Sequence, residues 1–130
     1  MQVYKTKGFA RFSRRQRIDD DALCEAISRA AQGLIDADLG GGLIKQRLAR
    51  AGQGRSRGDR MLAAYRTGKR AVFLYGFAKS GKASLASGEL VVYRQLAGVL
   101  LKADAAALAR LLADGEIFEV AFDGENPIPE

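Results

Sequence analysis

Hydrophobic residues recur along this chain with two different periods. Apolar residues return every three or four positions in residues 20–32, in 88–103 and again after Asp104, which is the spacing of an amphipathic helix. Between these segments, residues 43–50, 60–65 and 71–78 alternate or run continuously apolar, as strands do. The pattern predicts a central β-meander between helical segments.

The N-terminal part predicts one clear helix after a segment with two interpretations. Residues 3–17 are basic with scattered apolar positions, and their spacing fits either a short strand or a first helix. Asp19, Asp20 and Asp21 then supply an N-cap and negative charge in the first turn of a helix over 20–32. Gly33 is its expected stop.

The central part predicts three strands. The glycine run 40–42 is a break that leads into a strand over 43–50, in which Ile44 and Leu48 face one side and Lys45 and Arg47 the other. Residues 51–58 are too polar to pack and predict a long loop before the strand 60–65. A tight turn at 67–68 leads to residues 71–78, whose unbroken apolar run predicts a central strand covered on both faces.

The C-terminal part predicts two helices and a short strand. A polar loop over 80–87 precedes a helix over 88–103, and Asp104 caps a second helix that Gly115 ends. Residues 116–120 fit a last strand. We expect one domain over residues 1–120 and a disordered acidic tail over 121–130.

Charge is concentrated in the central part. Residues 40–82 hold eleven Lys/Arg and one acid, Asp59, which gives a net charge of +10. The whole chain of 130 residues has a net charge of +6, and its last third is acidic. A cationic surplus of this size on predicted sheet indicates a phosphate-bearing partner.

Composition excludes several kinds of chemistry. The chain has no histidine and one cysteine, so no His/Cys metal cluster and no internal disulfide is expected, and we expect no cofactor. The glycine run 40–42 precedes a predicted strand and lacks the Gly-Lys-Ser/Thr of a phosphate-binding loop. No apolar run reaches the length of a membrane span, and no signal peptide is evident, so we expect a cytoplasmic protein without a membrane partner.

Four cations form the candidate site. Lys45 and Arg47 share a strand face about 7 Å apart, Arg60 begins the next strand, and Lys79 follows the central strand. Tyr75 and Phe77 share the face of Lys79 if the strand is regular, and aromatic rings beside cations suit single-stranded RNA. The alternatives are an ordinary solvated face for the cations and core positions for both aromatic residues.

The chain resembles a known family at these residues. The segment GGGLIKQRLARAGQGRSRGDRMLAAYRTGKRAVFLYGFAKS, residues 40–80, is similar to the core of the RelE/ParE/HigB superfamily of type II toxin–antitoxin toxins, and closest to its RelE-like group. The runs KTKGFARF, DADLGGG and DGEIFEV fit the same group, so the resemblance spans about residues 1–120. It implies an α+β fold, a small twisted antiparallel sheet with N-terminal helices packed on one face and C-terminal helices.

The resemblance also implies a function. RelE-like toxins are mRNA endonucleases that cut in the ribosomal A site by attack of a 2′-hydroxyl on the adjacent phosphate. It implies phosphate stabilisation by Arg47 and Arg60, proton transfer or A-site RNA binding by Lys45, and leaving-group assistance by Lys79. RNA binding would involve further cations, Arg50, Arg55, Arg57 and Lys82. The implied partners are the ribosome, mRNA and a cognate antitoxin of helix-turn-helix type.

The sequence departs from the family pattern in three places. Gly58-Asp59-Arg60 stands where relatives often have Gly-Tyr-Arg, residues 80–84 differ, and no clear counterpart exists for the C-terminal tyrosine that some relatives use as a base. Two alternatives therefore stay open: a catalytically degenerate protein of this fold that binds nucleic acid or the ribosome, and a ParE-like gyrase inhibitor. The alternating Lys45 and Arg47 pair argues against the second.

Overall fold

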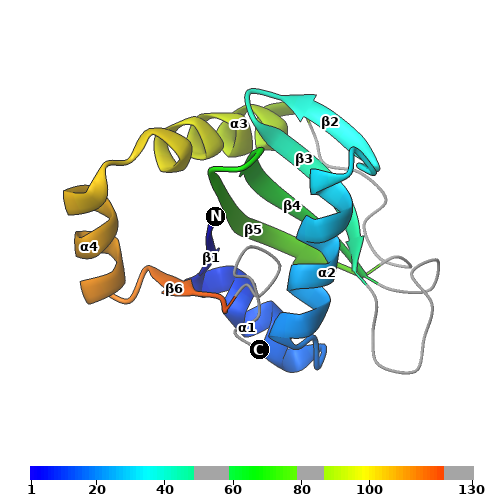
Figure 1. Cartoon of the computed structure of the whole chain (residues 1–130), viewed down its shortest axis with the longest axis horizontal. Helices are drawn as coiled ribbons and strands as arrows, with labels where there is room; N and C mark the ends of the chain where they lie inside the picture. Colours follow the sequence, from blue (N-terminus) through cyan, green and yellow to red (C-terminus); the bar gives the residue numbers. More distant parts are fainter. Residues whose placement is uncertain (49–58, 79–86, 122–130) are drawn as a thin grey trace, which may run out of the picture.

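The computed structural model describes residues 1–48, 59–78 and 87–121 (Figure 1). Within these ranges the chain forms six strands and four helices. The elements in chain order are β1 Gln2–Thr6, α1 Lys7–Arg15, α2 Asp20–Ala31, β2 Ala37–Gly40, β3 Leu43–Leu48, β4 Asp59–Arg66, β5 Arg70–Phe77, α3 Ser87–Lys102, α4 Ala105–Ala113 and β6 Ile117–Glu119.

The six strands form one sheet in the order β2-β3-β4-β5-β1-β6. The predicted meander is present as the antiparallel run from β3 through β4 to β5. The expected wholly antiparallel sheet is wrong in one pair, because β1 lies parallel to β5 and only then pairs antiparallel with β6. Hydrophobic patterning records which face a residue takes, not the direction of its strand, so the sequence did not reveal this.

Helices cover both faces of the sheet, which confirms the α+β fold and its layers (Figure 1). The first core lies under α1 and α2, which contribute Phe9, Phe12, Leu23 and Ile27. The second core lies under α3 and α4, whose Ala97, Leu100, Leu101 and Leu108 pack on the other face. β5 contributes to both cores, with Phe73 in the first and Val72 in the second, as expected of a central strand.

The helix starts follow the predicted capping chemistry. Asp19 caps α2 by accepting a hydrogen bond from the Ala22 amide at 3.0 Å, and Asp104 caps α4 by accepting one from Ala107 at 2.8 Å. The ambiguous segment 3–17 holds both of its candidate elements, β1 followed by α1. Thr6 separates them, since its hydroxyl accepts the Phe9 amide at 3.2 Å and thereby starts the helix.

The glycine run is a hairpin turn between β2 and β3. Gly40, Gly41 and Gly42 all have φ between 65° and 88°, which side chains disfavour. A Cβ at Gly42 would also lie 2.6 Å from Leu101 Cδ1, so a side chain there would displace that leucine of α3. Strand β2 was not predicted, because its four residues, Ala37–Gly40, alternate only between half-buried and exposed positions at the sheet edge.

A buried amide joins α2 to the sheet. The Gln46 side chain is fully buried in β3 and makes three hydrogen bonds. Its Nε2 donates to the carbonyls of Ala26 at 3.0 Å and Leu34 at 2.9 Å, while its Oε1 accepts the Asp36 amide at 3.1 Å. A buried polar group satisfied in this way fixes the connection from α2 to β2 at one position.

Gln46→Ala is expected to lower the free energy of unfolding by roughly 2 kcal/mol or more, because it removes a fully buried side chain together with its three hydrogen bonds. Urea unfolding followed by circular dichroism measures the change. The matched control is Gln95→Ala, on the exposed face of α3, with an expected change within about 0.5 kcal/mol. Equal effects of the two substitutions would contradict the assigned role of Gln46.

Candidate functional site

Three of the predicted site cations lie together on the face of the sheet that carries α3. In β3, Ile44, Gln46 and Leu48 are buried towards the α2 side, so the alternating Lys45 and Arg47 leave the strand on the other face, as predicted.

Arg60 of β4 is directly opposite Arg47 in the antiparallel register. Lys45, Arg47 and Arg60 are called the cation row below. Two arginines placed directly opposite each other repel, which costs stability in a sheet. The register therefore gathers positive charge where packing alone would not place it.

A β-bulge places two aromatic side chains beside the cation row. Leu62 of β4 pairs with Tyr75 and Ala63 pairs with Phe73, so Leu74 is an extra residue in β5. The extra residue reverses the alternation of the strand. Phe73 packs in the first core, whereas both Leu74 and Tyr75 pack in the second. Bulges of this kind re-aim side chains and occur frequently beside active sites.

Gly76 allows the reversed alternation of β5 after the bulge. A Cβ at Gly76 would overlap the ring of Phe12 from α1, so the residue directed to the α1 side must be glycine. Phe77 then lies on the same face as Tyr75, and it pairs with Arg60 across β4 and β5. Arg47, Arg60 and Phe77 thus form one line across three strands, each about 5 Å from the next by strand spacing.

The aromatic residues form a continuous group. The rings of Tyr75 and Phe77 are stacked with centroids 5.8 Å apart, and Tyr75 lies 5.5 Å from Tyr93 of α3. Tyr75 and Phe77 are half-buried, with Tyr75 packed at the margin of the second core. The prediction of core positions and the prediction of an accessible aromatic surface are therefore both partly correct for Tyr75 and Phe77. Tyr75 packs against the second core, and part of each ring remains accessible.

Arg47 is held at its guanidinium and at its backbone carbonyl. Its Nε lies 3.2 Å from Asp36 Oδ2, and its side chain remains 47% exposed. Its backbone carbonyl accepts a hydrogen bond from Arg29 Nη2 at 2.6 Å. The side-chain amide of Gln46 accepts the backbone N–H of Asp36, so the buried Gln46 also helps to position the carboxylate that contacts Arg47.

The acid next to Arg60 faces away from it. Asp59 is 1% exposed and alternates with Arg60, so its side chain leaves β4 on the side of Met61 in the first core. Its register partner, Leu48, is buried in the same core. The departure from the family pattern at Asp59 therefore places no carboxylate on the face of the cation row.

The remaining predicted site residues cannot be placed in the same way. Lys79, together with the RNA-binding candidates Arg50, Arg55, Arg57 and Lys82, lies outside the described residues. Residues 122–130, which make up most of the predicted tail, also lie outside the described residues. Leu48 and Asp59, on either side of the first gap, lie at the end of the sheet that carries the cation row, and β5 ends there at Phe77.

Sequence reasoning missed three features of this site: the bulge, Tyr93 and Asp36. The glycine between the two aromatic residues of β5 was the available signal for the bulge, since glycine within a strand often marks a bulge or a close approach.

Among the described helices, none has both the length and the apolar character needed to cross a membrane.

Comparison with known proteins shows the family of this chain. The family model described as the RelE toxin of the RelE / RelB toxin-antitoxin system matches residues 1–120. No curated protein matches the chain significantly. The match covers nearly the whole chain, including all three members of the cation row. The protein therefore belongs to the RelE family, the toxins of RelE / RelB toxin–antitoxin systems.

Proposed function

We propose that this toxin is a ribosome-dependent mRNA endonuclease. In the proposed reaction the 2′-hydroxyl oxygen forms a bond to the adjacent phosphorus, and the bond from phosphorus to the 5′-oxygen breaks. The 2′-hydroxyl proton passes to a base, and the departing 5′-oxygen takes up a proton. The products are a 2′,3′-cyclic phosphate and a 5′-hydroxyl end.

The single observation that carries this proposal is the opposition of Arg47 and Arg60, with Lys45 on the same face. The phosphorane transition state carries more negative charge on its oxygens than the ground-state phosphate. Cations fixed before the substrate arrives stabilise that added charge without having to reorganise. The repulsion between the arginines falls when a phosphate lies between them.

Each residue has a proposed role. Arg47 and Arg60 stabilise the phosphorane, and Lys45 transfers a proton or binds A-site RNA. Lys79, two positions after Phe77 in the sequence, assists the leaving group. Tyr75 and Phe77 hold a base of the mRNA by stacking, which orders the nucleotide against the cations.

The proposed partners follow from charge and family. Arg50, Arg55, Arg57 and Lys82 supply further positive charge for the RNA of the ribosome. Membership of the RelE family implies a cognate antitoxin. We propose an antitoxin of helix-turn-helix type with an acidic segment that covers the cation row and so prevents cleavage.

Arg60→Ala is expected to reduce mRNA cleavage by roughly 100- to 1000-fold, the usual effect of losing one group that stabilises transition-state charge. The measurement is inducible expression in a bacterial host, followed by primer extension on a translated mRNA. Arg110→Ala, an exposed arginine of α4, is the matched control and should cleave as the wild type does.

Wild-type cleavage by a folded Arg60→Ala variant would contradict the role of Arg60. Absence of cleavage by folded wild-type protein would favour the catalytically degenerate alternative instead. That alternative predicts RNA binding that weakens steeply with salt and is never followed by a cut.

Phe77→Leu is expected to raise KM for cleavage of ribosome-bound mRNA by about tenfold, with a smaller effect on kcat. The substitution keeps apolar volume but removes the ring, and base stacking contributes about 1–3 kcal/mol. Phe77→Trp should retain a KM near the wild-type value. Phe118→Leu, at an exposed phenylalanine of β6, controls for loss of a ring elsewhere. If Phe77→Leu leaves KM unchanged, Phe77 does not bind the base.

A further inference from the structure

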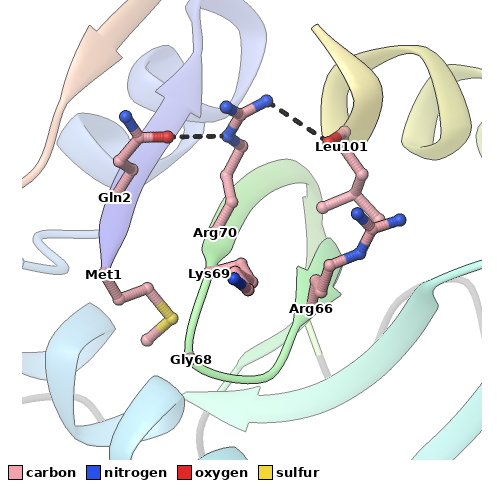
Figure 2. A pocket seen from close by; sticks show the side chains of 7 residues that line it. All are labelled: Met1, Gln2, Arg66, Gly68, Lys69, Arg70 and Leu101. Atoms are coloured by element: carbon pink, nitrogen blue, oxygen red, sulfur yellow. Dashed lines mark hydrogen bonds between the residues drawn. The ribbon is translucent and has the colours of Figure 1, made fainter. Parts of the chain in front are cut away.

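A second group of cations surrounds a cavity at the other end of the sheet (Figure 2). The cavity has a volume of about 550 Å³ and a mainly polar lining. It opens at the turn between β4 and β5. Arg66 is six residues along β4 from Arg60, or about 20 Å by strand rise, so this cavity is separate from the cation row. The residues that line it are Met1, Gln2, Arg66, Gly68, Lys69, Arg70 and Leu101.

Arg66, Lys69 and Arg70 lie within five residues of sequence, and among the described residues no acid lines the cavity. Arg66 is directly opposite Arg70 in the register of β4 and β5, so a second like-charge pair closes this hairpin. Arg66 and Lys69 are both exposed. Among the described residues, neither takes part in an ion pair. The tight turn itself does not need the charges of Arg66 and Lys69, and an anion bound between these cations would relieve the repulsion.

Arg70 is fixed in place but keeps its charge. Its Nε donates to Gln2 Oε1 at 2.9 Å, and its Nη1 donates to the carbonyls of Leu100 at 2.6 Å and Ala103 at 2.9 Å. These acceptors are uncharged, and the partial negative charge at the end of α3 offsets only part of a full positive charge. Figure 2 shows Arg66 and Arg70 reaching towards Leu101, with Lys69 between them.

We propose that this pocket binds linked phosphate groups. Three cations around one cavity match a ligand with more than one negative charge, and the volume exceeds what a single phosphate fills. The described residues that line the cavity include no aromatic side chain, so charge and not base stacking selects the ligand. The binding activity is additional to the proposed cleavage and does not depend on it.

Titration of the full-length protein with pyrophosphate, followed by amide chemical shifts in NMR, tests the proposal. Saturable shifts are expected at residues 66–70 and at Gln2. Arg66→Gln and Lys69→Gln should each weaken the Kd about tenfold or more, since each removes a charge-assisted hydrogen bond. Arg15→Gln, at an exposed arginine of α1, should leave the Kd unchanged.

The proposal is overturned if pyrophosphate causes no saturable shift at residues 66–70, or if Arg15→Gln weakens binding as much as Lys69→Gln does.

Where pyrophosphate does bind, a competition experiment identifies the source of the phosphates. Displacement by a cleavage-resistant 2′-O-methyl RNA oligonucleotide supports binding of RNA backbone, and retention of pyrophosphate supports binding of a small phosphorylated molecule. The titration and the cleavage assay report on different ends of the sheet, so either can fail alone.

Discussion

The placement of Arg47 and Arg60 directly opposite each other on β3 and β4 is the constraint on which the rest of the candidate site depends. Opposed cations cost stability, and the fold contains features that keep them opposed. The buried Gln46 amide fixes the backbone beside Asp36, and Asp36 in turn meets the guanidinium of Arg47 at 3.2 Å. The contact with Asp36 offsets part of the repulsion between the two arginines, while the side chain of Arg47 stays about half-exposed.

The bulge in β5 shapes the same end of the sheet, on the side of β4 opposite to β3. A regular strand would direct Tyr75 and Phe77 into the first core and Gly76 towards the cations. One extra residue, Leu74, reverses this and brings an aromatic pair next to Arg60. The cost falls on Gly76, which must lack a side chain because the ring of Phe12 occupies the space. The proposed binding surface and the packing of the first core therefore depend on the same few residues.

Much of the fold could be predicted because it depends on local chemistry. Capping by Asp19 and Asp104, the face of Lys45 and Arg47, and the central position of β5 all follow from residue type and spacing. The bulge, the parallel pairing of β1 and the position of Asp36 depend on contacts between distant segments. Asp59 shows the difference clearly: beside Arg60 in sequence it suggested a competing charge, whereas strand alternation buries it on the opposite face.

The account's central claim is that the cation row acts on a phosphate under attack by its own 2′-hydroxyl. The most direct measurement programs ribosomes with a short mRNA whose nucleotide before the mapped cut carries a 2′-deoxyribose. We expect cleavage of the all-ribose mRNA to leave a 2′,3′-cyclic phosphate, and the single deoxy substitution to abolish that cut. Cleavage that persists at the deoxy position, or a 3′-hydroxyl end on the all-ribose product, would contradict the account.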